Sequence, residues 1–184
     1  MLRTRLQQIM LRARLQQITD NRDLSTHRNM LEALRRELPH SIEMLSGPND
    51  DLQYNCVVHA FGVQEDQEYI ALWHACPRHV HGNTTFVQFM IENGDLNERE
   101  PPASGLLAIY FHEGAVRHIG RLISESRIVS KWGTGHLYEH DIFDVPSCYG
   151  EVVRYYRSAE RDQVLNRFIE FAEGKGVHFG ASDD

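Results

Sequence analysis

The stretch that decides the fold is Gly105-Leu-Leu-Ala-Ile-Tyr-Phe-His-Glu-Gly-Ala-Val-Arg-His-Ile-Gly-Arg-Leu-Ile-Ser-Glu-Ser-Arg-Ile-Val-Ser-Lys131. Its short runs of branched and aromatic residues, typical of strands, are Leu106–Phe111, Ala115–Ile123 and Arg127–Lys131. His112-Glu-Gly114 and Ser124-Glu-Ser126 separate these runs and favour hairpin turns. A further run of this kind follows at Val152–Tyr156. We therefore expect an antiparallel meander.

Helical patterns flank this meander on both sides. Upstream helices are predicted from Ser25 or Thr26 to about Leu38, from Tyr54 to Gly62 and from Thr85 to about Gly94, and a last helix from Ser158 to about Glu173. Helices that precede a meander indicate an α+β fold. We divide the chain into an amino-terminal helical extension (1–44), a core domain (45–157) and a carboxy-terminal helix with its tail (158–184).

The charge of the chain is acidic and unevenly distributed. Its 184 residues include 19 Lys+Arg and 26 Asp+Glu, a net charge of −7. Residues 1–40 carry eight Arg and four acids (8 − 4 = +4), so the remaining 11 basic and 22 acidic residues leave 11 − 22 = −11 for residues 41–184. An acidic body disfavours nucleic-acid binding. No apolar run approaches the roughly 20 residues of a membrane span, and we expect a cytoplasmic protein without cofactor or membrane partner.

The amino terminus contains a duplication. Leu2-Arg-Thr-Arg-Leu-Gln-Gln-Ile9 returns as Leu11-Arg-Ala-Arg-Leu-Gln-Gln-Ile18, nine residues later. Nine steps of about 100° amount to half a turn beyond whole turns, so the apolar residues of the two copies point in opposite directions on one straight helix. Either the helix breaks near Met10, or both faces are covered, or one copy is dispensable; we favour the last.

Cys56 and His118 are the residues most able to carry chemistry. Cys56 stands at the predicted start of a helix, whose oriented amides stabilise a thiolate, and a nearby histidine removes the thiol proton. With a period of two, His118 shares a strand face with Val116, Gly120 and Leu122, and Gly120 leaves room beside the ring. A buried cysteine that only packs in the core is the competing interpretation.

The segment Tyr54-Asn55-Cys56 resembles the nucleophile segment, Tyr-Asp-Cys-Ser-Gly, of NlpC-type peptidases in the papain-like cysteine peptidase superfamily. His118-Ile119-Gly120 is similar to the histidine strand of these enzymes. A closer resemblance is to a group of bacterial proteins that share an ordered set of motifs. These motifs are present here as Tyr54-Asn55-Cys56 to Gly62, His118, Ser130-Lys131-Trp132-Gly133, His140 and Tyr149-Gly150. The resemblance implies a helical half bearing Cys56, packed on a small antiparallel sheet bearing His118.

The resemblance also implies residue roles. Cys56 would be the nucleophile, His118 the general base and Tyr54 a contributor to the oxyanion site. The third catalytic position falls near Ser130. His140 is expected in the loop after that strand, from which its side chain would reach back to the site. Asn55, Lys131 and Trp132 complete the candidate binding residues, with Lys131 facing a substrate carboxylate. Asn55 and Val57-Val58 replace the Asp and Ser-Gly of the family pattern.

These observations favour a cysteine-dependent hydrolase or acyltransferase that acts on an amide bond of a peptide or protein. The alternative is a non-catalytic papain-like domain used for binding, with the Arg-rich helix as its docking arm. A third alternative is a zinc-stabilised domain, because His74, Cys76, His79 and His81 fall within eight residues. We expect no metal site, since structural zinc sites usually draw ligand pairs from separate elements.

Overall fold

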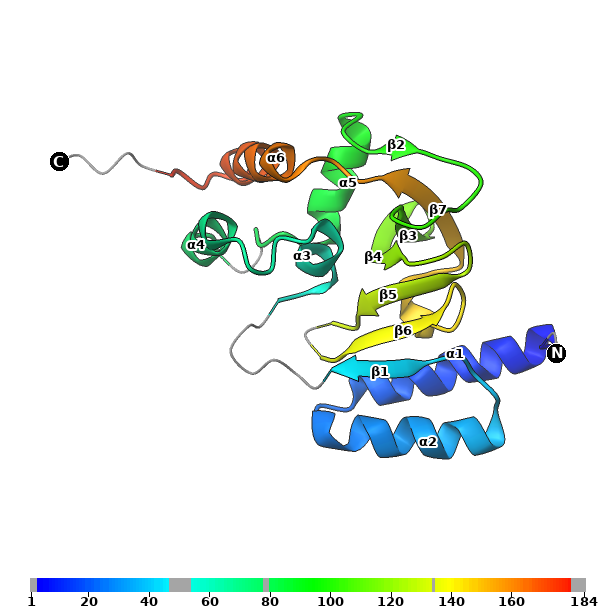
Figure 1. Cartoon of the computed structure of the whole chain (residues 1–184). Coiled ribbons are helices and arrows are strands. Elements are labelled where there is room, and N and C mark those ends of the chain that lie inside the picture. The colour runs from blue at the N-terminus through cyan, green and yellow to red at the C-terminus, as the bar shows by residue number, and fades with distance from the viewer. Residues whose placement is uncertain (1–2, 47–53, 78–79, 134, 180–184) are drawn as a thin grey trace.

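The computed structural model describes residues 3–46, 54–77, 80–133 and 135–179 (Figure 1). The α+β class is confirmed. The helices are α1 (Arg5–Asp20), α2 (His27–Glu37), α3 (Cys56–Phe61), α4 (Gln67–Ala75), α5 (Thr84–Glu92) and α6 (Arg161–Glu173). The strands are β1 (Glu43–Ser46), β2 (Asn97–Glu98), β3 (Leu107–His112), β4 (Ala115–Leu122), β5 (Arg127–Lys131), β6 (Leu137–Asp141) and β7 (Val152–Arg157). Two short 3-10 turns are η1 (Leu24–Thr26) and η2 (Ser147–Tyr149). None of the described helices is both long and apolar enough to cross a membrane.

The strands form one antiparallel sheet in the order β1-β6-β5-β4-β3-β7-β2. The predicted meander corresponds to β3, β4 and β5, with β7 added beside β3. The loop predicted around His140 is wrong, because Leu137–Asp141 is strand β6 between β1 and β5. Tyr138 and His140 are buried there, while Glu139 between them is half-buried. The burial therefore alternates with the period of two of a strand, but the sequence does not show this alternation because most of the residues are polar.

Two hydrophobic clusters cover the two faces of this sheet. The α3-side cluster joins α3, α4, α5 and α6 to Leu107, Ile109 and Ile119 of the central strands. The α1-side cluster joins α1 and α2 to Ala108, Tyr110 and Ile128. Neighbouring residues of β3 enter opposite clusters, as the alternation of a strand requires. In Figure 1, α1 and α2 accordingly lie together beside β1 and β6, apart from the other four helices.

Helix α1 runs unbroken through both copies of the duplication. Leu11, Leu15 and Ile18 of the second copy are buried, with 0%, 0% and 3% exposure. Leu6 and Ile9 of the first copy are 67% and 57% exposed, because the half-turn offset turns them away from the sheet. The break near Met10 and the covering of both faces were wrong predictions; that one copy is dispensable stays a prediction. Leu2 lies outside the described residues.

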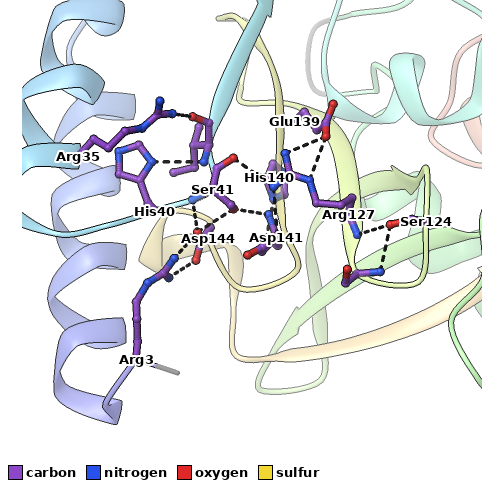
Figure 2. Close-up of polar contacts among 12 residues, drawn as sticks. Arg3, Arg35, His40, Ser41, Ser124, Arg127, Glu139, His140, Asp141 and Asp144 are labelled. Atoms are coloured by element: carbon purple, nitrogen blue, oxygen red, sulfur yellow. Dashed lines mark hydrogen bonds and ion pairs between the residues drawn. The ribbon is translucent and has the colours of Figure 1, made fainter. Parts of the chain in front are cut away.

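Polar contacts tie the amino-terminal segments to the end of β6 (Figure 2). The buried Asp144 carboxylate accepts from Arg3, at 2.8 Å for Nη2, and from the backbone and hydroxyl of Ser41 at 2.9 and 2.8 Å. Burial alone raises the pKa of Asp144, but the bonds from Arg3 and Ser41 outweigh it and hold the pKa below its usual value. Ser41 Oγ in turn accepts from the Asp141 N–H at 2.7 Å.

Candidate functional site

Asn55 fixes the start of helix α3 and with it the position of Cys56. Its Oδ1 accepts from the backbone N–H groups of Val57 and Val58 at 3.0 and 3.1 Å, which caps the helix. Its Nδ2 donates to the Gly82 carbonyl at 2.7 Å. Asn55 therefore contributes both a cap and a link to the segment before α5; the aspartate of the NlpC-type pattern would keep the cap but has no N–H to form the link.

Helix α3 packs beside the part of β4 that β5 leaves unpaired. Among the described residues, β4 and β5 pair at Arg121↔Val129 and Leu122↔Ile128, while α3 contacts both strands. The Cys56 thiol, in a residue 9% exposed, faces the N–H of Ile119 on β4. Burial of the thiol raises its pKa to about 11, although the N–H groups of Ile119, Cys56 and Val57 act in the opposite direction. The thiol is therefore protonated at neutral pH in this arrangement.

His118 immediately precedes Ile119 and turns to the α1 side of the sheet. Its ring stacks on Tyr149 with a centroid separation of 3.8 Å and an interplanar angle of 7°. Its Nε2 is buried and has no hydrogen-bond partner in the described part of the chain. Burial, and then the nearby His140, lower the pKa of His118 well below its usual value, so the ring is neutral. The unpartnered nitrogen of this neutral ring can accept a proton, and the lowered pKa makes it a weaker base than an ordinary histidine.

The surroundings of His118 differ in two ways from the sequence prediction. A bulge between Tyr110 and Phe111, where the partner residue changes from His118 to Val116, sends Val116 into the α3-side cluster. Gly120 does not leave empty space. A Cβ at Gly120 would approach Ile128 Cγ2 at 2.6 Å and Ser130 Cβ at 2.8 Å, so its missing side chain lets β5 come close.

Ser130 and His140 bond to each other. Ser130 Oγ lies 2.7 Å from His140 Nε2, and His140 Nδ1 lies 2.9 Å from the Asp141 carbonyl oxygen. Neither forms a hydrogen bond with His118 within the residues that the structure describes. The pair lies behind His118 on the α1 side, and its effect there is electrostatic, through the contribution of His140 to the pKa of His118.

Tyr54 and Lys131 lie at the other side of Cys56. The Tyr54 ring stacks on His59 of α3 at 6.2 Å, and the Lys131 ammonium lies 4.1 Å from the centroid of the same ring. Trp132 is 3% exposed and packs against Tyr138 at 4.3 Å, which places it in the α1-side cluster. A substrate-binding role for Trp132 stays a prediction, whereas its core packing is observed.

Tyr149 is a residue of the candidate site to which the sequence analysis assigned no role. It stacks on His118, and burial and then the proximity of Cys56 raise its pKa well above its usual value, so it lies near both residues. The signal was present in the Tyr149-Gly150 motif. Gly150 has φ +100°, and a Cβ there would meet the Phe111 carbonyl oxygen at 2.2 Å. Arg12 of α1 donates to the Gly150 carbonyl and holds this turn in place.

The described members of the histidine-rich segment, His74, Cys76 and His81, do not converge on a point. His81 Nε2 lies 3.0 Å from the Cys76 carbonyl oxygen, and the His74 and His81 rings both lie beside Trp73, at 6.0 and 5.3 Å. His79 lies outside the described residues. No group of three or more His, Cys, Asp or Glu suited to a metal ion occurs in the described part of the chain.

A protein-family model described as a domain of unknown function, DUF7689, matches residues 45–157. The match includes Cys56, His118, Ser130, His140 and Tyr149, while α6 and the whole amino-terminal extension (1–44) lie outside it. No curated protein and no solved structure matches the chain. Because the model covers more than half of the sequence, the chain belongs to the DUF7689 family.

Proposed function

We propose that the protein is a cysteine-dependent hydrolase or acyltransferase of the papain-like, NlpC-like type, acting on an amide bond of a peptide or protein. Cys56 Sγ attacks the carbonyl carbon while its proton passes to His118 Nε2. His118 then gives that proton to the departing nitrogen, which leaves as an amine, and a thioester remains on Cys56. Water releases an acid from the thioester in a hydrolase, and an amine releases a new amide in a transferase.

The observation that carries this proposal is the state of His118. Its Nε2 is buried and unpartnered among the described residues, and the Tyr149 stack holds its ring. An unsatisfied buried polar atom costs about 1–3 kcal/mol, so a structure that keeps one indicates a use for it. Cys56 lies against the N–H of the next residue, Ile119, which supports a shared site. His118 can accept the thiol proton without breaking an existing bond.

A non-catalytic domain of the same fold is the second candidate. Two observations favour it: Cys56 is only 9% exposed, and burial raises the pKa of its thiol to about 11. Both are properties of a cysteine that serves only to pack. The two candidates therefore make opposite predictions about the reactivity of this thiol.

The test is iodoacetamide labelling of the native protein from pH 5 to 9, with the rate measured for each cysteine by peptide mass spectrometry. Cys76 is the internal control, because it is also buried, with 6% exposure, and belongs to the same cluster. We expect Cys56 to react at least about tenfold faster than Cys76 near pH 7, since proton transfer by a positioned base contributes about 10²–10⁴-fold. His118→Ala should remove this advantage.

The matched control variant is His81→Ala, which removes the histidine in contact with the Cys76 carbonyl and should leave Cys56 unaffected. If Cys56 is instead the slowest of the three cysteines and His118→Ala leaves its rate unchanged, the enzyme proposal is wrong and the binding domain is favoured. Thermal unfolding of each variant establishes that a lost reactivity does not come from a lost fold.

A further inference from the structure

Lys131 is a buried cation with few partners. The residue is 3% exposed, and its Nζ donates to the Gly135 carbonyl at 2.8 Å and lies 4.1 Å from the centroid of the Tyr54 ring. None of the ion pairs among the described residues involves it. An ammonium group has three N–H donors, and one carbonyl satisfies only one of them. Buried charges are normally paired, because desolvation costs several kcal/mol per ion.

The position of Lys131 connects it to Cys56. Tyr54, whose ring faces the ammonium, is separated from Cys56 by one residue, and β5, which ends at Lys131, contacts α3. The Tyr54 ring also stacks on His59 of α3, the helix that begins at Cys56. The Lys131 ammonium thus lies against the short segment Tyr54 to His59, which carries the Cys56 thiol.

A second cation without a carboxylate partner among the described residues lies on the same side of the sheet. Arg121 donates from Nε and Nη2 to the Ala60 carbonyl, at 3.3 and 2.7 Å, near the end of α3. Burial, followed by Arg121 and Lys131, lowers the pKa of His59 to about 4, so His59 is neutral between them. Two cations therefore lie beside α3, and none of the ion pairs among the described residues neutralises them.

We propose that Lys131 binds a carboxylate of the substrate, so that the amide bond attacked by Cys56 lies next to an acidic group. This inference rests on the proposed function, since it assigns the substrate class of the same site. A carboxylate matches what Lys131 offers: one positive charge and two N–H positions left after the bond to Gly135. A phosphate dianion requires more donors than this lysine supplies. Peptides with an acidic side chain or a free carboxyl terminus beside the scissile bond fit this requirement.

The experiment compares two alkylating agents that differ in charge, iodoacetate and iodoacetamide. The ratio of their rates at Cys56 measures the attraction of a carboxylate to the site, independently of thiol reactivity. Lys131→Met keeps the length of the side chain and removes its charge. We expect it to lower the iodoacetate-to-iodoacetamide ratio about tenfold, equivalent to about 1.4 kcal/mol for one charge-assisted bond.

Lys175→Met is the matched control, because Lys131 and Lys175 are the two lysines of the chain and Lys175 is exposed. It should leave the ratio unchanged. A ratio that Lys131→Met also leaves unchanged, while Cys56 still reacts rapidly with both agents, overturns the carboxylate site and leaves the proposed function standing. If neither agent labels Cys56 faster than Cys76, the proposed function fails and this inference with it.

Thermal unfolding separates recognition from a structural role. Because Lys131→Met removes a buried charge that has no counterion in the described structure, we expect its Tm to equal or exceed that of the wild type. A Tm several degrees below the wild type would show that the bond to Gly135 holds the fold together, and would contradict the assignment of Lys131 to a substrate.

Discussion

The two faces of the sheet are built differently. The α3-side cluster has a centre of completely buried apolar side chains, among them Phe86, Val87 and Phe168, and the buried charge of Lys131 lies beside Tyr54, which packs against this cluster. The α1-side cluster is interleaved with buried polar groups, among them Ser130 and His140. Buried polar groups contribute less to stability than apolar packing unless each is satisfied. The α3 side is therefore held mainly by apolar packing, whereas the α1 side also keeps a hydrogen-bonded pair of polar side chains within its core.

The candidate site lies where these two faces meet. Cys56 belongs to the α3-side cluster, called the apolar face below, and Tyr149 to the α1-side cluster, called the polar face. Strand β4 connects the two, because it carries the adjacent residues His118 and Ile119. The alternation of a strand sends adjacent residues to opposite faces, so this site depends on both layers being in place. Substitutions that displace one face should therefore damage the site even when the other face is intact.

The largest effect is expected from Gly150→Ala, which should disturb the polar face by forcing the backbone at Gly150 and Phe111 apart. The residue combines φ +100° with a Cβ position 2.2 Å from the Phe111 carbonyl oxygen, and neither atom belongs to a flexible side chain. We expect a loss of about 5 kcal/mol, as for the most severe substitutions, measured by denaturant unfolding. Gly94→Ala is the control, since Gly94 has φ +75° but nothing within 4 Å, and should lose about 1 kcal/mol. Equal losses would show that strain, and not the approach to Phe111, determines the result.

The next largest effect tests whether only the second copy of the duplication supports the polar face. Leu15→Ala should lower the free energy of unfolding by about 4 kcal/mol, because the side chain is completely buried. Leu6→Ala, the same change at the equivalent position of the first copy, should stay within about 0.5 kcal/mol of the wild type, because Leu6 is 67% exposed. Chemical denaturation of both variants measures the difference. A comparable loss for Leu6→Ala would mean that the first copy is also covered in solution.

Acid should destabilise the polar face. Burial lowers the pKa of His140 from about 6.5 to about 4, so the native state prefers the neutral ring. Stability from this preference is complete above about pH 6.5 and is lost as the pH falls toward 4, by about 3 kcal/mol in all. His140→Gln retains a group able to bond Ser130 and should reduce the acid-induced loss by that amount. The exposed His112→Gln is the control, and an unchanged slope of stability against pH in His140→Gln would contradict the assignment.

The sequence predicts an element best where its local pattern of apolar residues and turns is enough to identify it. The strands β3, β4 and β5 were predicted because their apolar runs are interrupted by clear turns. The helix at Cys56 was predicted from the spacing of its apolar residues and the glycine that follows, and Gly62 does end it, with φ +71°. Strand β6 was missed because Glu139 and Asp141 alternate with Tyr138 and His140. A histidine within a polar run gives no sign in the sequence that it is buried in a strand. Its burial depends on neighbours that lie far away in the sequence.

The site was predicted as a set of residues but not as a geometry. The proximity of Cys56 to the histidine strand follows from the order of the elements. The bulge that separates Val116 from His118 could not be predicted, because it depends on the pairing of β3 with β4. Tyr149 was overlooked because stacking on His118 is decided by the Gly150 turn and by Arg12 of α1, which come from opposite ends of the chain.

The smallest effect is expected on the apolar face, at Asn55, where the NlpC-type pattern has an aspartate. Asn55→Asp keeps an oxygen for the cap of α3 but replaces the Nδ2 donor with an acceptor that faces the Gly82 carbonyl at about the 2.7 Å of the present bond. We expect a loss of about 1 kcal/mol at pH 7, and slower alkylation of Cys56 as the start of α3 shifts. Asn83→Asp is the matched control, because Asn83 caps α5 with its oxygen alone, at 2.9 Å from the Thr85 N–H, and its change should leave stability and alkylation unaltered. If both variants behave alike, the cap is all that Asn55 provides, and the polar face with its stacked His118 determines the site without help from the segment before α5.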